Sequence, residues 1–478
     1  MTQRGLTIKE PLNILSDDEV ERIHVGTLEV LESTGVVFEN KKALEILDSW
    51  GCNVDFEKQL VRFPSYLVEE SIRRCPSSFT IQARHPDYNL RVGGQTLYFG
   101  PFVGMETLDW QTNRKRSPTT EDARNGVKVI DFLDNLQACY GPYFSFADVP
   151  PVMTVPTQTA ILFRNTPKPT MGLSGFDAEV WQIKMAQATG QELIGNVGSA
   201  PPLTWSDSIT TAAFRYIDSG FPIIPVSGLN FGANSPATLA GSLILNNAEL
   251  LSMITLIQLV KPGTRIIAAN YSQPMDMRTS QPLLGSIEKA LAGMAFAQMW
   301  RYYHVPSFQT VSSDAKLPDY QCGYEKSMAL LLQALAGYSI LAVAGTVYDE
   351  LMWSPVMAII DNDVIGSLGR ILQGIEVNDE TMAVDLIREV GPIPGHYLNT
   401  SHTRKWWKHE LFLPVLADRL SYPEWINAGS MGILERAKIK FDEIIVNHQP
   451  LPLSEEQEKA VSEILEEAEI FYKEHGML

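Results

Sequence analysis

Short runs of small and apolar residues alternate with longer helical patterns from about residue 125 onwards. Parallel strands need such intervening helices, because each connection must return to the end of the sheet at which the previous strand began. About eight strand candidates separated by helices favour a parallel barrel over a sandwich of antiparallel strands. The candidate strands are LQACYG, PTMGLSG, IGNVGSAPP, IIPVSGLNFG, RIIAANYS, SFQTVSSDAK, ILAVAGTVY and VMAIIDND.

This pattern predicts a TIM (β/α)8 barrel over residues 125–440. Residues 1–124 mix short helical and extended patterns, and we expect an N-terminal mixed α+β extension that packs on the barrel. The glutamate-rich end of the chain predicts a C-terminal helical tail over residues 441–478, with its helix starting at Ser454. A doubly wound open sheet is the alternative, but the glycine fingerprint G-x-G-x-x-G that usually follows its first strand is missing from the sequence.

Charge and cysteine content narrow the classes of partner. The formal net charge is -18, so the chain repels phosphate backbones and we expect no nucleic-acid partner. The 4 cysteines are widely spaced, which is typical of reduced thiols rather than of a disulfide framework or a zinc cluster. The N-terminus lacks an apolar signal core and no window reads as an unbroken membrane span, which predicts a cytoplasmic protein without membrane contact.

In a parallel barrel the reacting groups lie in the loops that follow the strands. Charged pairs follow two of the predicted strands: Asp276 and Arg278 follow RIIAANYS, and Asp314 and Lys316 follow SFQTVSS. We predict that Asp276, Arg278 and Asp314 are catalytic. The candidates for substrate binding are Lys316, Tyr348, Asp349 and Trp353, together with Tyr98, Phe99 and Phe102 in the segment LYFGPFVGMET.

These residue types suit a zwitterionic ligand, because aromatic faces and carboxylates attract a cation while arginine or lysine binds a carboxylate. Structural interpretations compete with this one. A pair such as Asp276 and Arg278 in MDMRT more often forms a structural ion pair, and clustered aromatic residues more often pack in a core. Gly100 and Gly104 favour a ligand near Tyr98, since glycine permits close approach.

The histidines do not suggest a metal site. His396, His402 and His409 are six and seven residues apart, which differs from the i,i+4 pair of a helical zinc site. We therefore expect no protein-bound metal. The sequence also lacks the G-x-S-x-G motif of serine hydrolases.

Several spaced motifs together resemble the trimethylamine methyltransferase (MttB) superfamily, over about residues 15–470. The chain is written entirely in standard residues, so it resembles the branch without pyrrolysine. The segment GTVYDELMWSPVMAIID departs from the family pattern, because it is more aromatic and acidic. The motifs that carry the resemblance are YFGPFVGMETLDWQTNRKRSPTTEDARN, SPATLAGSLILNNAELLSMITLIQLVKPGTRIIAANYSQPMDMRT, SSDAKLPDYQCGYEK and HELFLPVLADRLSYPEWINAGS.

The resemblance implies an enzyme that moves a methyl group from a quaternary amine to the cobalt(I) of a corrinoid protein. Glycine betaine is the first choice of substrate, followed by proline betaine and carnitine. No tightly bound cofactor is implied, because the methyl acceptor is cob(I)alamin carried by the partner protein. We also expect a homo-oligomer, with Trp406, Trp407 and the C-terminal helix as candidate surfaces.

Within this interpretation each candidate residue has a role. The substrate carboxylate is held by Arg278 or Lys316, or by backbone N–H groups near Gly100. A modest aromatic cage holds the ammonium group, and nearby carboxylates add negative potential. The cage consists of Tyr98, Phe99, Phe102, Tyr348 and Trp353, and the carboxylates are Asp276, Asp314 and Asp349.

Two other functions remain open on the residues alone. One is a barrel lyase or isomerase that uses Asp314 and Lys316 as acid and base, and it would work without cobalamin. The other is a non-catalytic protein that binds betaines without transferring a methyl group.

Overall fold

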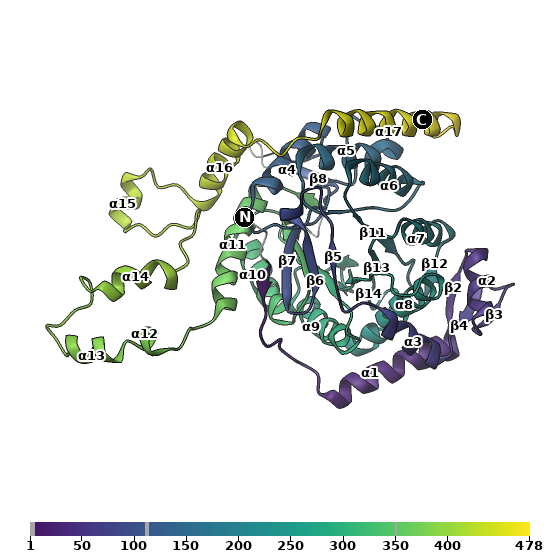
Figure 1. Ribbon diagram of the computed structural model, residues 1–478, viewed down its shortest axis with the longest axis horizontal. Helices are drawn as coiled ribbons and strands as arrows, with labels where there is room; N and C mark the ends of the chain where they lie inside the picture. Colours follow the sequence, from purple (N-terminus) through teal and green to yellow (C-terminus); the bar gives the residue numbers. More distant parts are fainter. Residues whose placement is uncertain (1–4, 110–113, 349–350) are drawn as a thin grey trace.

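The computed structural model describes residues 5–109, 114–348 and 351–478. At its centre lies a curled eight-stranded sheet in the order β1–β7–β19–β18–β15–β13–β11–β10 (Figure 1). Neighbouring strands are parallel, except that β1 is antiparallel to β7. The strands are β1 Leu6–Thr7, β7 Thr96–Pro101, β10 Thr170–Met171, β11 Leu193–Gly198, β13 Ile223–Ser227, β15 Ala268–Asn270, β18 Ser307–Thr310 and β19 Ile340–Ala344.

Helices cover the outer side of the sheet. On β7, Tyr98 belongs to the apolar cluster inside the curl, whereas Leu97 and Phe99 belong to the larger cluster shared with the helices. Because both faces are covered, the strands read as continuous apolar runs, as parallel strands usually do. The helices are α4 Thr120–Phe132, α5 Thr154–Asn165, α6 Ala178–Thr189, α7 Asp207–Ser219, α8 Leu239–Val260, α9 Ile287–Tyr302, α10 Tyr320–Leu335 and α11 Pro355–Gln373.

The segment LQACYG joins the two edges of the curl, although it is not assigned as a strand. The backbone N–H groups of Gln137 and Ala138 donate to the carbonyl of Phe99 on β7, at 2.8 and 3.1 Å. On the other side, Cys139 donates to Pro169 at 2.8 Å, and Met171 on β10 donates to Cys139 at 3.0 Å. The molecule is therefore a mixed α/β fold in which residues 137–139 hydrogen-bond to both edges of a curled parallel sheet.

The N-terminal region contributes to this sheet, which differs from the division expected at residue 124. The sheet takes in β7 because Thr96–Pro101 pairs in parallel with β19 and is buried from Leu97 to Pro101. The hairpin of β5 and β6 adds Ile81, Leu90 and Val92 to the cluster inside the curl. The preceding elements are α1 Asp17–Glu29, the π-helical turn η1 Val30–Thr34, β2 Val36–Phe38, α2 Lys41–Ser49, β3 Asn53–Asp55, β4 Leu60–Arg62, α3 Ser65–Arg74, β5 Ser78–Ile81, the 3-10 turn η2 Pro86–Tyr88 and β6 Leu90–Gly93.

Short strands beyond the sheet edge shape the loops. Thr204–Trp205 (β12) joins β2, β3 and β4 in a small sheet, and two more sheets form near the ends of the parallel strands. The first of these consists of β14 Asn230–Phe231, β16 Gln273–Asp276 and β17 Gln281–Pro282. The second consists of β20 Thr346–Val347, β21 Met352–Trp353, β8 Glu106–Asp109 and β9 Arg114–Arg116.

The C-terminal part differs from the predicted barrel limit at residue 440. The run VMAIIDND, predicted as a strand, lies inside α11, where Ser354 caps the first turn and Pro355 occupies it. After α11 the chain leaves the body and returns in α16 Ile433–Asn447 (Figure 1). The helix predicted to start at Ser454 is confirmed as α17 Glu455–Glu474, with Ser454 as its N-cap.

One helix of the described residues, α8, is long and apolar enough to cross a membrane by length and composition alone. Of its most apolar window, 83% is buried inside the protein, so packing accounts for its apolar character. The sequence prediction that no window is long and apolar enough to cross a membrane is therefore wrong for α8. This helix packs in the interior of the protein.

Candidate functional site

Four aromatic side chains meet inside the curl, at the end where the parallel strands finish, which we call the mouth. The Phe102 ring lies edge-on to Tyr140 and Tyr271, with ring centroids 5.6 and 5.2 Å apart. The Phe308 ring lies 6.0 Å from Tyr140 and 5.9 Å from Tyr271. These four residues, the mouth aromatic cluster, come from four different strand segments, so the curl of the sheet brings them together.

The hydroxyl groups of the cluster are held by hydrogen bonds. The Tyr140 and Tyr271 hydroxyls lie 3.1 Å apart, and the Asn196 amide donates to the Tyr140 hydroxyl at 3.2 Å. Ser174 donates to the carbonyl of Asn196, which ties the end of β11 to the neighbouring loop. Tyr271 is partly exposed, whereas Phe102, Tyr140 and Phe308 are buried. Of the four rings, Tyr271 is therefore the one most accessible to solvent.

A buried ammonium group lies next to the same strand. Side chains alternate along β18, so Thr310 lies on the same face as Phe308, about 6.6 Å further toward the mouth. The Lys289 ammonium donates to the Thr310 hydroxyl at 3.2 Å, although Lys289 is only 3% exposed. Ser312, the next residue on that face, has a buried hydroxyl with no hydrogen-bond partner among the described residues. The Lys289 ammonium and the Thr310 hydroxyl therefore lie next to the aromatic cluster, on the side toward the strand ends.

Buried acids fix the loops around the mouth. Glu249 on α8 accepts hydrogen bonds from the hydroxyls of Ser199 and Ser227, at 2.6 and 2.7 Å, and from the Leu203 N–H at 2.7 Å. Burial raises the pKa of Glu249, and these hydrogen bonds oppose that rise. Glu325 on α10 accepts from the Ser313 hydroxyl at 2.6 Å and from the Asp314 N–H at 2.9 Å.

A buried ion pair holds the loop after β19. The Lys326 ammonium lies 2.6 Å from the Asp361 carboxylate, and both side chains are buried. Asp361 also accepts from the Gly345 N–H at 2.8 Å, while Lys326 donates to the Thr346 carbonyl at 2.9 Å. Burial raises the pKa of Asp361, and the Lys326 ammonium opposes that rise. The pair therefore positions the loop rather than facing the mouth aromatic cluster.

The structure brings Asp276 and Arg278 together in the turn between β16 and β17. Arg278 donates to the Asp276 carboxylate through Nε and Nη2, at 2.9 and 2.8 Å, and through its backbone N–H. These hydrogen bonds lower the pKa of Asp276 to about 2. The Arg278 side chain is 88% exposed, so the pair forms a salt-bridged turn at the rim. Its predicted catalytic role stays a prediction.

Asp314, Lys316 and Tyr348 also meet at the rim. Asp314 accepts a hydrogen bond from the Gly285 N–H at 2.8 Å. Lys316 donates to the carbonyl of Asp314 at 2.6 Å, and its ammonium lies 4.6 Å from the centre of the Tyr348 ring. The cation and ring therefore pair with each other. Asp349, which was predicted to bind the substrate, lies outside the described residues.

Three predicted cage residues lie elsewhere. Tyr98 points into the curl near the start of β7, where its hydroxyl accepts from the Arg91 N–H at 3.1 Å. Phe99 faces the helical layer, because adjacent residues of a strand point to opposite faces. Trp353 is fully buried and donates to the Ala344 carbonyl at 3.0 Å. Of the five predicted aromatic residues, only Phe102 belongs to the mouth aromatic cluster.

Sequence reasoning missed Tyr140, Tyr271 and Phe308 because it looked for charged groups after the strands. Each of the three lies within or directly after a predicted strand, at a position where alternation points the side chain inward. Lys289 was missed because it lies on a helix, well before β18 in sequence. Glu249 could have been found from sequence, because it is the one charged residue of α8 and a buried carboxylate needs hydrogen-bond partners.

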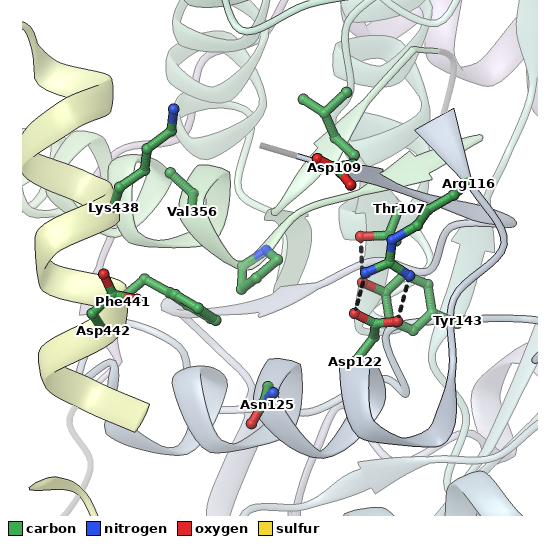
Figure 2. Close-up of a pocket in the computed structure, with 12 residues that line it drawn as sticks. Thr107, Asp109, Arg116, Asp122, Asn125, Tyr143, Val356, Lys438, Phe441 and Asp442 are labelled. Atoms are coloured by element: carbon green, nitrogen blue, oxygen red, sulfur yellow. Dashed lines mark hydrogen bonds and ion pairs between the residues drawn. The ribbon is translucent and has the colours of Figure 1, made fainter. Parts of the chain in front are cut away.

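A separate cavity of about 640 Å³ lies between β8, α4, α11 and α16 (Figure 2). Within it, Arg116 forms two hydrogen bonds with Asp122, both at 2.7 Å, and Tyr143 donates to Thr107 at 2.9 Å. None of the four cluster rings lines it. The lining residues are Thr107, Leu108, Asp109, Arg116, Asp122, Asn125, Tyr143, Pro355, Val356, Lys438, Phe441 and Asp442. Among residues 5–109, 114–348 and 351–478, no group of three or more His, Cys, Asp or Glu is arranged to hold a metal ion.

Comparison with known proteins gives the class of this protein, which is a methyltransferase. The chain is 30% identical over 486 residues to trimethylamine methyltransferase MttB of Desulfitobacterium hafniense (strain DSM 10664 / DCB-2), covering 99% of this chain and 97% of that one. It is 31% identical over 456 residues to glycine betaine methyltransferase of Desulfitobacterium hafniense (strain Y51), covering 93% and 94%.

The family follows from a match over nearly the whole chain. Residues 2–469 match the model of trimethylamine methyltransferase (MTTB), and the chain belongs to this family. The fold is similar to that of the crystal structure of monomethylamine methyltransferase (MtmB) of Methanosarcina barkeri, with a TM-score of 0.55 and 14% identity, covering 97% of this chain and 90% of that one. The resemblance stated from the sequence motifs is thus confirmed.

Proposed function

We propose that this methyltransferase takes a methyl group from a quaternary amine that carries a carboxylate and transfers it to the cobalt(I) of a corrinoid protein. Glycine betaine is the first choice of substrate, then proline betaine or carnitine. One relative is named a glycine betaine methyltransferase, and others are named trimethylamine methyltransferases. The observation that carries the proposal is the mouth aromatic cluster with the Lys289 ammonium beside it.

The scaffold of the proposed site is a closed (β/α)8 barrel. The segment 137–139, which hydrogen-bonds to β7 and to β10, acts as the eighth parallel strand beside the seven parallel strands of the sheet. Sites at the carboxyl ends of such strands are the general rule for this architecture. The mouth aromatic cluster has that position.

The cluster suits a positively charged methylammonium group. Aromatic faces attract such cations by about 0.5–2 kcal/mol each, according to how far the cation is desolvated. A quaternary nitrogen leaves as a neutral tertiary amine, so no acid has to protonate it. In agreement, Asn196, which donates to the Tyr140 hydroxyl of the cluster, is uncharged. Modest attraction is an advantage, because the positive charge on nitrogen falls as the methyl group departs.

Lys289 distinguishes a betaine from trimethylamine. A carboxylate beside the ammonium group of the substrate can accept a charge-assisted hydrogen bond from Lys289. Trimethylamine has no such group, and in its protonated form it would be repelled by the buried ammonium. We propose Lys289 in place of Arg278 and Lys316 as the carboxylate partner, because Lys289 is buried next to Thr310 whereas the other two side chains are exposed at the rim.

The roles of the corrinoid partner and of this chain in methyl transfer follow from the methyltransferase class. The corrinoid cobalt(I) of the partner supplies the nucleophile, and the nitrogen keeps the electron pair of the broken bond. The chain itself orients the substrate and limits water access, with the loops around the mouth fixed by Glu249, Glu325 and Asp361. We place the reaction in the cytoplasm, with no tightly bound cofactor, and with a corrinoid protein as partner.

A substrate panel tests this proposal. Glycine betaine, proline betaine, carnitine, trimethylamine and tetramethylammonium are each supplied with cob(I)alamin, and loss of the cob(I)alamin absorbance is followed. We expect the carboxylated quaternary amines to give the highest kcat/KM. Calorimetric binding of each compound is measured alongside. Preference for trimethylamine in both measurements would overturn the proposed substrate, and betaine binding without turnover would favour the non-catalytic alternative.

Variants of two lysines test the assignment within the site. We expect Lys289→Met to lower kcat/KM for glycine betaine by about 10- to 100-fold, since a hydrogen bond to a charged group contributes about 1.5–3 kcal/mol. The same variant should leave tetramethylammonium unimpaired, because that compound has no carboxylate. Lys316→Met is the matched control and should cause the smaller loss. The reverse order would return the carboxylate role to Lys316.

A further inference from the structure

Residues 375–432, which we call the arm, extend away from the body except near residues 415–417, whose backbone N–H groups donate to Asp363 on α11 (Figure 1). The arm starts after α11 ends at Gln373 and finishes where α16 begins at Ile433. It contains four short helices joined by loops. These are α12 Asp379–Met382, α13 Val384–Val390, α14 Ser401–Glu410 and α15 Tyr422–Asn427.

The arm exposes an unusual amount of apolar surface. Of the 42 large hydrophobic residues that are exposed among the described residues, 15 lie in the arm. Ile393 is 95% exposed and Leu398 is 87% exposed, and Leu416 is the one arm residue that is buried. All 58 arm positions (375 to 432) are described, so this segment has almost no core of its own.

Such a segment needs a surface to pack on. Helices of 4 to 10 residues are marginal in water without tertiary contacts. Contiguous apolar surface beyond a few hundred Å² on a soluble protein marks an interaction site. A fully exposed large apolar side chain has on the order of 100 Å² of surface that can be buried. Scaled by their exposed fractions, the 15 arm side chains together offer about 1,000 Å², which exceeds the ~800 Å² per partner of a standard interface.

The body carries an apolar face that can receive it. On α10, Tyr320, Tyr324 and Met328 are spaced four residues apart and are all exposed, and the two tyrosine rings lie 5.8 Å from each other. On the neighbouring helix α9, Ile287 and Leu291 are also four residues apart and exposed. Residues four apart lie on one side of a helix, so each helix presents one apolar stripe. We call these five side chains the α9–α10 face.

We propose that the arm of one chain packs on the α9–α10 face of a second copy, and that the second arm returns the contact in a two-fold dimer. A reciprocal contact uses the same two patches twice and closes on itself, as most homodimers do. Burial of this much apolar surface is typical of permanent interfaces rather than of transient ones.

A second copy suits the arm better than the corrinoid protein does. A corrinoid protein must leave after each transfer, which would return the whole apolar arm to water in every cycle. A second copy of the chain stays in place. The arm also includes Trp407, which is 42% exposed, and tryptophan is among the residues that most often dominate binding energy at interfaces.

The proposed contact lies beside the mouth. Ile287 and Leu291 flank Lys289 on α9, with Lys289 directed inward and the other two directed outward. Gly285, just before this helix, donates to Asp314 at the rim. The arm of the second copy would therefore hold the start of α9 from outside while Lys289 lies on the inner side.

The first test is the mass of the full-length protein in solution, measured by sedimentation over a range of concentrations. We expect a dimer for the wild type. Ile387→Glu in the arm, where the residue is 54% exposed, should weaken dimerisation by about 100-fold or more, because a charge would enter an apolar contact. Ile470→Glu on α17 is the matched control, with 56% exposure, and should leave the dimer intact.

Met328→Glu tests the receiving face and should weaken the dimer as Ile387→Glu does. A wild-type monomer, or a dimer that survives both Ile387→Glu and Met328→Glu, would overturn the proposal. Dissociation by Ile387→Glu alone would overturn the α9–α10 face as the receiving surface. Circular dichroism and a thermal unfolding curve of each variant confirm that it is folded.

Chemical cross-linking identifies the contacting surfaces directly. Unlabelled and 15N-labelled proteins are mixed and treated with a lysine-reactive cross-linker. We expect mixed-isotope links between Lys405 or Lys408 of the arm and Lys316, which is exposed just before α10. Links confined to single-isotope pairs would show that the arm packs on its own chain and would overturn the exchange. These readouts do not depend on the substrate, so their failure would leave the proposed reaction untouched.

Discussion

The mouth and the arm are two irregular regions of one chain that are held in opposite ways. At the mouth, buried acids such as Glu249 and Glu325 bind the N–H and hydroxyl groups of the loops. In the arm, ion pairs such as Lys405 with Glu380 are exposed, and the apolar side chains face solvent. The described mouth loops thus have their partners within one chain, whereas the proposed second copy would supply the surface on which the arm packs.

The largest effect is expected from breaking the buried ion pair at the mouth. Asp361→Ala would leave the Lys326 ammonium buried without its counter-ion and would free the Gly345 N–H. Removing one partner of a buried pair typically costs about 3–5 kcal/mol of stability. We expect a loss of this size in chemical or thermal unfolding.

An exposed pair in the arm is the control for that measurement. Asp385 pairs with Arg388 at 2.6 Å, but both side chains are largely exposed. Exposed pairs contribute little, because water and salt screen them. Asp385→Ala should therefore leave stability nearly unchanged. Equal losses from the two variants would remove the distinction between mouth and arm.

Proteolysis under native conditions, repeated at several protein concentrations, compares the cleavage rates of the arm and of the mouth loops. The arm should be cut slowly where the protein is dimeric and about tenfold faster after dilution below the dimer dissociation constant, since the protected fraction follows mass action. The mouth loops should be cut slowly at every concentration, because each is fixed within its own chain. Mass spectrometry of early fragments gives both rates. Arm cleavage that does not vary with concentration would contradict this prediction.

The smallest effect concerns pH and Glu249. Burial raises the pKa of Glu249 in the folded protein above its ordinary value of 4.5. A raised pKa contributes stability that is fully present below the unfolded value and is lost as pH rises through the folded value. The Glu249→Gln variant does not titrate there. The melting temperature of the wild type minus that of the variant should therefore increase as pH falls from about 7 to about 5.

This difference cancels the titration of the other groups common to both proteins. A difference that stays constant with pH, or that falls as the solution becomes more acidic, would show that Glu249 is ionised at least as readily in the folded protein as in the unfolded chain. Scanning calorimetry of both proteins across this range provides the measurement.

The alternation of strands and helices was readable from sequence because parallel strands are apolar on both faces. The same property hid β7, whose run was assigned to the N-terminal extension, and VMAIIDND, whose apolar residues lie on the buried side of α11. A short apolar run such as VMAII fits either a strand or a buried helix, and its flanking capping residues help to separate the two.

The candidate site was partly predictable. Strand-end reasoning placed Asp276, Arg278 and Asp314 at the rim, and the aromatic residues beside the glycines of LYFGPFVGMET included Phe102. It did not find the other three cluster rings, because charged groups were given more weight than inward-facing positions. The contact of Lys289 with Thr310 joins a helix to a strand that follows later in the chain, so it depends on packing that no local pattern records.

The loop after β19 is fixed at both of its ends. Gly345 donates to Asp361, and Ser354 donates back to the Gly345 carbonyl at 2.9 Å. Residues 346–353 lie between these anchors, and they include much of the segment that departs from the family pattern. Between the anchors Val347 and Trp353 are buried, whereas Leu351 is exposed. Substitutions that leave the scaffold undisturbed are therefore confined to the few exposed positions of the loop, while its buried positions remain tied to folding stability.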